Sequence, residues 1–215
     1  MTDSKKIFLS DARGSRVAAR HFSGCGRGMA LILPGLNYLA DAPLMVAVRE
    51  VLINHAADVI AVDYDYREVE GFGAATDEQK LAWLAADGIS YLGSAREQFP
   101  DGPVIVAGKS LGTMCMADIS GLPEGSRLVW LTPSLRGTGL MEKIAAKSVP
   151  HFSLIGSLDA AVEVTRRADY LDIPQMTHVE CPGLVHAWQH EDGVEAEIAE
   201  TKKAMAALER WLLQR

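Results

Sequence analysis

Short apolar runs alternate with amphipathic stretches along the chain, and this alternation limits the available folds more than any other feature of the sequence. The runs 29–33 and 104–107 are apolar throughout, which is typical of strands buried on both faces of a sheet. The stretch 42–56 instead carries apolar residues at helical spacing. Strands that alternate with helices predict βαβ units around a mostly parallel sheet, with helices on both of its faces.

The pattern predicts the following elements in chain order. Two strands at 6–10 and 16–22 are expected to form a hairpin. Further strands are expected at 29–33, 58–62, 104–107, 127–131, 151–155 and 176–180. Helices are expected at 42–56, at 76–98 with a candidate break at Gly88, at 110–121, at 139–147 and at 193–213. Because the 215 residues contain no repeat and no linker-like tract, we expect one α/β domain over 1–215, with no separate lid domain.

Charge and composition exclude several classes of partner. A formal net charge of −7 makes a phosphate-neutralising surface unfavourable, so no nucleic-acid partner is expected. No apolar run approaches the ~20 residues that span a bilayer, so no membrane association is expected. The three widely spaced cysteines are typical of reduced thiols, and the N-terminal segment lacks the apolar core of a signal peptide. We therefore expect a cytoplasmic protein.

The segment 104–113 carries the most informative motif, because an apolar strand runs directly into the sequence GKSLG at 108–112. In a Gly-x-Ser-x-Gly nucleophile elbow, a sharp strand-to-helix turn exposes the serine, here Ser110, and the two glycines avoid clashes. Gly-Lys-Ser also ends a phosphate-binding loop, but Pro103 stands where that motif needs its first glycine. A structural turn with Ser110 as a helix N-cap remains the alternative here.

A nucleophilic serine needs a histidine base and a carboxylate that orients the base. In this type of fold they follow in the order serine, acid, histidine, at the carboxyl edge of the sheet. Among six histidines, His186 lies in a loop between the last predicted strand and the final helix. Asp159 follows the strand 151–155 in a Gly-x-x-Asp turn. We therefore expect His186 as the general base and Asp159 as its orienting acid.

Together these segments resemble the α/β-hydrolase superfamily, and in particular its small, lidless serine hydrolases with a GKSLG elbow. The resemblance covers nearly the whole chain and includes the Leu-Pro-Gly turn at 33–35. It implies the α/β-hydrolase fold, with Ser110, Asp159 and His186 as the catalytic triad. It also implies an oxyanion hole made by the backbone N–H groups of Leu36 and Leu111, which would stabilise the negative charge of a tetrahedral intermediate.

Residues that flank the proposed catalytic loops are expected to bind the substrate. They are Tyr38, Leu135, Leu184 and Trp188, with Leu36 and Leu140 beside them. These mostly apolar side chains favour an acyl or small aromatic group over a phosphorylated substrate. The segment 63–75 is too short for a multi-helix lid, so the site is expected to be open.

The expected function is a serine hydrolase that cleaves small soluble carboxylic esters or thioesters through an acyl-enzyme intermediate. Water completes the reaction, so no cofactor and no metal are expected, and activity should rise through roughly pH 6–7 as the base becomes neutral. An acyltransferase, a lactonase or a peptidase with the same triad remains an alternative. So does a non-catalytic protein of this fold that binds a ligand or a partner. The sequence specifies no oligomeric state.

Overall fold

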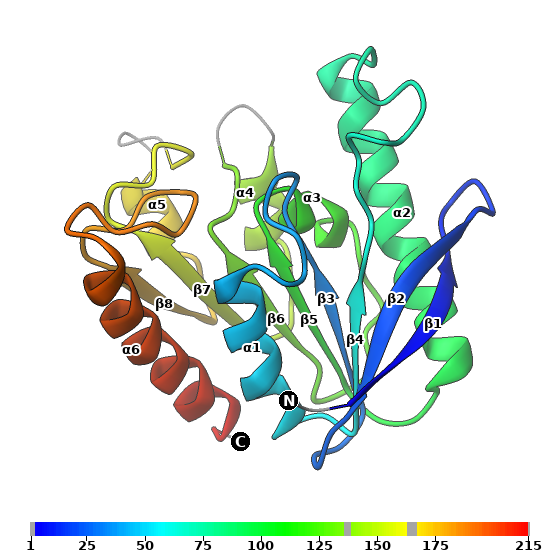
Figure 1. The fold of residues 1–215 in the computed structure, drawn as a ribbon, viewed down its shortest axis with the longest axis horizontal. Coiled ribbons are helices and arrows are strands. Elements are labelled where there is room, and N and C mark those ends of the chain that lie inside the picture. The colour runs from blue at the N-terminus through cyan, green and yellow to red at the C-terminus, as the bar shows by residue number, and fades with distance from the viewer. Residues whose placement is uncertain (1–2, 136–138, 163–166, 215) are drawn as a thin grey trace.

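A computed structural model describes residues 3–135, 139–162 and 167–214 (Figure 1). Its strands are β1 (Ser4–Ser10), β2 (Arg16–Ser23), β3 (Met29–Leu33), β4 (Asp58–Val62), β5 (Val104–Lys109), β6 (Arg127–Leu131), β7 (His151–Gly156) and β8 (Met176–Cys181). Its helices are α1 (Pro43–Ile53), α2 (Asp77–Gln98), α3 (Leu111–Met116), α4 (Leu140–Ala145), α5 (Arg167–Leu171) and α6 (Val194–Leu212). Strands and helices therefore alternate after the first hairpin, as predicted.

All eight strands belong to one sheet, in the order β1-β2-β4-β3-β5-β6-β7-β8. β1 and β2 form the predicted antiparallel hairpin, and β2 also pairs antiparallel with β4. Every later pairing is parallel, from β4 through to β8. The carboxyl ends of β3, β5, β7 and β8 therefore meet at one edge of the sheet. The mostly parallel sheet predicted from the sequence is confirmed.

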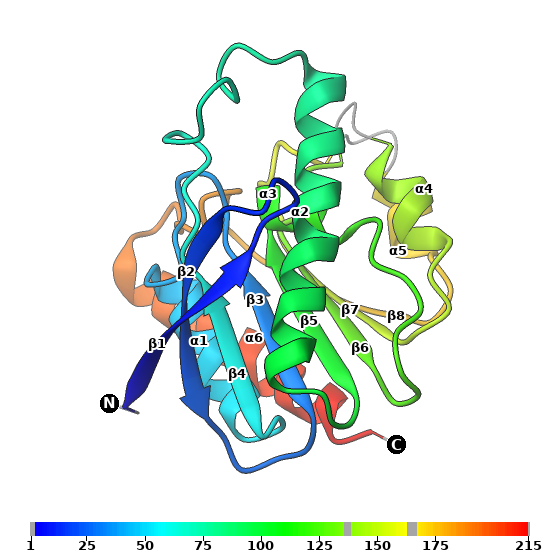
Figure 2. The same cartoon turned by 90° about the vertical axis from the view of Figure 1, so that its right-hand side faces the viewer.

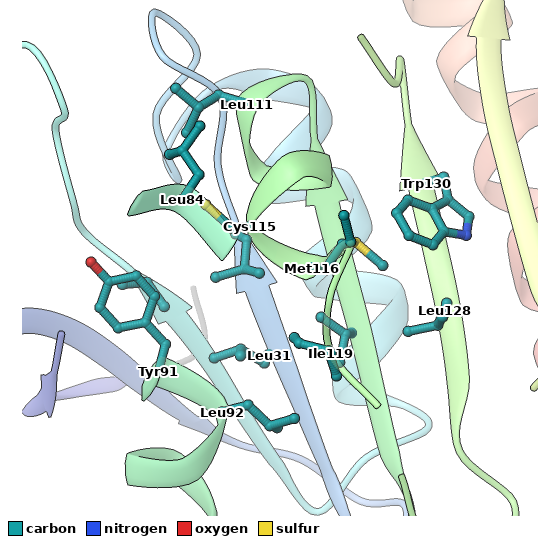
Figure 3. Packing of buried hydrophobic residues seen from close by; sticks show 14 of the residues in the cluster. Leu31, Leu84, Tyr91, Leu92, Leu111, Cys115, Met116, Ile119, Leu128 and Trp130 are labelled. Carbon is teal, nitrogen blue, oxygen red and sulfur yellow. The ribbon is translucent and has the colours of Figure 1, made fainter. Parts of the chain in front are cut away.

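The helices cover both faces of the sheet (Figure 1). On one face, α1 and α6 pack through residues such as Leu44 and Leu208. On the other face, a second apolar cluster includes Leu31 of β3, Leu92 of α2 and Met116 of α3 (Figure 3). Because the central strands contribute side chains to both clusters, they are apolar at every position, which explains the continuous runs in the sequence.

Helix α2 is continuous through Gly88, so the break considered there is absent. A Cβ added at Gly88 would lie 1.8 Å from the carbonyl oxygen of Cys115, which belongs to α3. Glycine therefore allows α2 and α3 to approach closely and does not mark a helix end. Helix α3 ends at Met116, several residues earlier than the predicted end near position 121.

Helix α2 begins in a capping box at the end of the long connection from β4. The Thr76 hydroxyl accepts a hydrogen bond from the Gln79 N–H, and the Gln79 side chain accepts one from the Thr76 N–H. Figure 2 shows this connection rising beyond the sheet beside the first turns of α2. Across the described part of the chain, no helix combines the length and apolar character needed to cross a membrane.

Candidate active site

Ser110 lies at a strained turn between β5 and α3. Its backbone has φ 49° and ψ −111°, in the region of positive φ that residues other than glycine rarely adopt. A Cβ at Gly108 would lie 2.5 Å from the carbonyl oxygen of Gly112, and a Cβ at Gly112 would lie 2.0 Å from that of Leu33. Both glycines of the motif are therefore required by close backbone packing, as expected for a nucleophile elbow. This turn presents Ser110 at the carboxyl edge of the sheet.

A continuous chain of hydrogen bonds joins Ser110, His186 and Asp159. His186 Nε2 lies 2.8 Å from Ser110 Oγ, and His186 Nδ1 lies 3.0 Å from both carboxylate oxygens of Asp159. Asp159 exposes only 3% of its surface, and its Oδ1 also accepts the Ala161 N–H at 2.8 Å. The carboxylate is thus buried and hydrogen-bonded, which fixes the orientation of the imidazole. The structure brings together all three residues singled out in the sequence.

Ser110 does not cap the helix that follows it. Its side chain makes no capping hydrogen bond to α3, so the interpretation of this residue as a simple N-cap is wrong. Its hydroxyl instead contacts His186 and lies 3.3 Å from Ser134 Oγ in the segment after β6. Its backbone N–H donates to the Leu131 carbonyl at 3.0 Å, which fixes the start of the turn. The hydroxyl is therefore directed toward the histidine.

The turn after β3 lies directly against the elbow. A Cβ added at Gly35 would meet Ser110 Cβ at 3.5 Å. The Gly35 N–H donates to the Tyr38 carbonyl at 3.0 Å, which closes the turn that contains Leu36. The Tyr64 hydroxyl donates to the Pro34 carbonyl at 2.6 Å, and burial raises the pKa of Tyr64 well above its usual value, so this donor stays protonated. The backbone at Leu36 is therefore held beside the nucleophile.

A pocket of about 470 Å³ opens beside the elbow. Apolar side chains from four segments of the chain line it: Leu36, Phe72, Leu81, Leu84, Leu111 and Met114. Arg67, Asp77 and Lys80 supply charged groups to the same lining. The pocket thus extends from the two residues of the expected oxyanion hole toward the β4–α2 connection. Its volume lies within the range of small-molecule sites.

Of the residues expected to bind the substrate, Leu36 lines this pocket, whereas Leu140 and the four others do not. Leu184 and Trp188 expose 0% and 1% of their surface and pack in the core beside α1 and α6. Leu135 is also buried, and Tyr38 is half-buried with its hydroxyl accepting the Leu44 N–H at 3.1 Å. Among the described residues, none of these four lines the pocket. They lie away from this pocket because neighbouring positions of a loop point in different directions, and periodicity does not specify which of them face a cavity.

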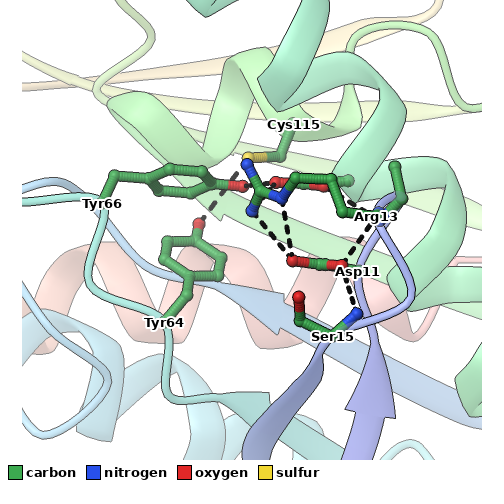
Figure 4. Close-up of polar contacts among 8 residues, drawn as sticks. Asp11, Arg13, Ser15, Tyr64, Tyr66 and Cys115 are labelled. Atoms are coloured by element: carbon green, nitrogen blue, oxygen red, sulfur yellow. Dashed lines mark hydrogen bonds and ion pairs between the residues drawn. The ribbon is translucent and has the colours of Figure 1, made fainter. Parts of the chain in front are cut away.

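A buried polar cluster supports the wall of the pocket that Tyr66 forms (Figure 4). The Tyr66 hydroxyl donates to Asp87 Oδ2 at 2.7 Å, and the Ala12 N–H donates to Asp87 Oδ1 at 3.0 Å. Arg13 Nη2 lies 3.6 Å from the same carboxylate and 2.8 Å from Asp11 Oδ2. The cluster therefore ties the β4–α2 connection to α2 and to the β1–β2 turn, which keeps the pocket wall in place.

Comparison with known proteins rests on structure alone. No protein-family model matches the sequence, and no curated protein is similar to it in sequence. An α/β serine hydrolase homologue from Coxiella burnetii gives a TM-score of 0.74 at 12% identity, covering 98% of this chain and 97% of its own. The chain has the α/β-hydrolase fold. An esterase from Pyrococcus furiosus gives a TM-score of 0.73 at 12% identity, covering 98% of this chain and 90% of its own.

A third solved structure of this α/β-hydrolase fold is a serine hydrolase without a lid from Xanthomonas campestris. It gives a TM-score of 0.70 at 16% identity and covers 100% of this chain and 98% of its own. The two chains therefore share their whole fold despite the low sequence identity. The fold implied by the sequence resemblance is confirmed.

The sequence did not indicate two further polar residues of this site. Ser134 lies in the segment after β6, and its position at a strand end was the available signal. Lys109 exposes only 1% of its surface although it is a lysine, and its Nζ donates to the His186 carbonyl at 3.0 Å. The apolar run before it was the signal that the strand, and hence burial, extends to this position. Both residues contact the three-residue chain of hydrogen bonds.

Proposed function

We propose that this protein is a serine hydrolase that cleaves carboxylic esters or thioesters of small molecules. The observation that carries the proposal is the unbroken chain of hydrogen bonds from Ser110 through His186 to Asp159, which begins at a strained elbow. Strain of this kind persists only where the surrounding structure enforces it, and it is concentrated at functional sites. The solved structures that share the fold include an esterase, which agrees with this chemistry.

In the proposed reaction, Ser110 Oγ attacks the acyl carbonyl while His186 Nε2 takes the hydroxyl proton. Asp159 keeps the proton of the imidazole on Nδ1 and stabilises the imidazolium that forms. His186 then gives its proton to the leaving alcohol or thiol, which departs and leaves an acyl group on Ser110. A water molecule, deprotonated by His186, attacks that acyl group and restores the serine. The residues at the site carry out every proton transfer.

We further propose that the backbone N–H groups of Leu36 and Leu111 form the oxyanion hole. The support is their position, because Leu111 follows the nucleophile directly and the turn with Leu36 lies against the elbow. Each donor of this kind contributes roughly 3–4 kcal/mol to stabilising the transition state.

The pocket suggests the class of acyl group. Its lining is apolar next to Leu36 and Leu111, so an alkyl or small aromatic acyl chain would be buried there while its carbonyl lies at Ser110. We therefore propose an acyl group of moderate size and a small leaving group. The sparse cysteines, free in the structure, support a cytoplasmic location.

The proposal is tested by measuring the hydrolysis of ester and thioester substrates whose acyl groups range from acetyl to octanoyl. The wild type is compared with Met114→Trp, in which the larger side chain fills the pocket. The wild type should hydrolyse both series, and the variant should lose about 10-fold or more in kcat/KM on octanoyl relative to acetyl substrates. The control Leu122→Trp places the same side chain at a separate pocket and should change neither series. An inactive wild type would contradict the proposed function, and an equal loss at every length would contradict the acyl pocket.

A further inference from the structure

Lys109 is a buried cation whose position the proposed reaction does not explain. It is the last residue of β5, directly before Ser110, and it exposes 1% of its surface. Removing an ammonium group from water is unfavourable unless the protein supplies compensating interactions. An apolar side chain of the same length would fill the space without this cost. The contacts of the ammonium group therefore indicate its role.

The ammonium group contacts the loop that carries the proposed base. Lys109 Nζ donates to the main-chain carbonyl of His186 at 3.0 Å. Because that carbonyl belongs to the residue whose imidazole contacts Ser110, the bond fixes the histidine backbone relative to the elbow. The Asp159 carboxylate adds a favourable electrostatic interaction with the same cation. One lysine thus interacts with both His186 and Asp159, the other two residues of the hydrogen-bonded chain.

The same group contacts the turn that carries the proposed oxyanion donor. Lys109 Nζ lies 4.4 Å from the centroid of the Tyr38 ring, in a cation–π arrangement. The Tyr38 carbonyl accepts the Gly35 N–H, and the Tyr38 hydroxyl accepts the Leu44 N–H. The ring is therefore fixed at both ends, and the ammonium group links the turn containing Leu36 to the elbow.

We propose that Lys109 is a positioning residue, whose buried ammonium group holds the His186 loop and the Tyr38 turn against the elbow so that base, nucleophile and oxyanion donors stay aligned. The inference rests on the proposed hydrolase function and extends it. Alignment of this kind has a large effect on rate, since a displacement of about 1 Å can cost 10²-fold. Lys109 itself need not touch the substrate.

The charge on Lys109 is sensitive to pH near neutrality. Burial lowers the pKa of Lys109 to about 8, although Asp159 opposes the shift. The ammonium group also faces the Tyr38 ring and the backbone carbonyl of His186. Burial raises the pKa of Tyr38 above its usual value, so its ring remains neutral. The charge of Glu197 in α6 also raises the pKa of Tyr38. As pH rises through 8, the attraction of Lys109 to the Tyr38 ring and to Asp159 is lost.

The test compares Lys109→Met with Lys147→Met. Lys147 is the control because it is partly buried and its Nζ, like that of Lys109, donates to a main-chain carbonyl, that of Ile119 at 2.7 Å, away from the site. On a short-chain ester, Lys109→Met should lower kcat about 10- to 100-fold with little change in KM. The wild-type rate should fall above pH 8, and this alkaline decline should be absent from the variant. Lys147→Met should retain the wild-type rate and pH profile.

Two further measurements separate positioning from folding and from the function itself. The unfolding midpoint of Lys109→Met at pH 7 should equal or exceed that of the wild type, because no charge is buried. Labelling of Ser110 by a fluorophosphonate should be slower in Lys109→Met than in the wild type. If Lys109→Met is labelled as fast as the wild type, or if its rate still falls above pH 8, the role of Lys109 is overturned while the hydrolase proposal stays intact. A wild type that neither labels nor hydrolyses esters would overturn both.

Discussion

At the scale of single residues, the hydrogen-bonding partners of a side chain distinguish a functional from a structural role. Both His186 and His21 pair with an aspartate, at 3.0 Å and 2.8 Å respectively. Only His186 also contacts a serine, and only its partner Asp159 is wholly buried at the side chain. The His21–Asp58 pair lies on the β2–β4 side of the sheet, and both of its side chains are partly exposed to solvent. The two pairs therefore offer a matched comparison.

Asp159→Asn should lower kcat roughly 10⁴-fold, because an amide stabilises the wrong tautomer of the imidazole. The neutral amide also fails to stabilise the imidazolium that forms during the reaction. Asp58→Asn makes the same change of side chain at the other pair and should leave kcat within about twofold. Steady-state kinetics on one ester substrate measures both effects. Equal activity in the two variants would show that the Asp159–His186 contact has no part in the reaction.

The sequence was sufficient to find the three residues of the hydrogen-bonded chain, because each follows a predicted strand and their order along the chain is restricted. The sequence was insufficient to predict which side chains line the pocket. Leu184 and Trp188 lie close to His186 in sequence, yet their side chains point into the core. Phe72 and Met114 line the pocket from distant segments. The packing of α2 against α3, and of Phe72 against Trp83 of α2, brings these segments together, and local patterns do not encode those contacts.

At the scale of elements, the close contact between α2 and α3 supports the elbow. Helix α3 is short, and the strained Ser110 turn leads directly into it. The absence of a side chain at Gly88 lets the backbone of α3 approach α2. Any displacement of α3 would move Leu111 and Met114, which border the pocket.

Gly88→Ala and Gly93→Ala should have opposite effects on stability, although both lie in α2. The added methyl at position 88 meets the Cys115 carbonyl and should destabilise the fold by about 1–3 kcal/mol, with loss of activity. At position 93 nothing lies within 4 Å, so alanine should stabilise the helix by about 0.5–1 kcal/mol. Urea unfolding measures both changes. Similar effects of the two substitutions would mean that α2 and α3 are not in close contact.

At the scale of the whole molecule, histidines whose ring nitrogens are buried make stability depend on pH. Burial lowers the pKa of His178 in β8 to about 4, with Arg167 lowering it further and Glu180 opposing the shift. Burial also lowers the pKa of His151 in β7. An unfolded histidine binds a proton near pH 6.5, so acid favours the unfolded chain. The contribution of His178 is fully present above pH 6.5 and is lost as pH falls toward 4.

The free energy of unfolding should therefore fall by about 2–3 kcal/mol between pH 6.5 and 4 on account of His178. His178→Phe keeps a ring beside Tyr170 and removes the titrating group, so it should flatten this part of the profile. Unfolding in urea at several pH values measures the slope. An identical decline in wild type and variant would show that His178 is not buried as a neutral group.

The most direct test of the account is the covalent labelling of Ser110. Intact mass after treatment with a fluorophosphonate should show one stable adduct on the wild type, placed on Ser110 by peptide mapping, and none on Ser110→Ala. Ser134→Ala removes the neighbouring hydroxyl, 3.3 Å from Ser110 Oγ, and should still be labelled. An adduct on Ser134, or no adduct on a folded wild-type chain, would contradict the assignment of Ser110 as the nucleophile.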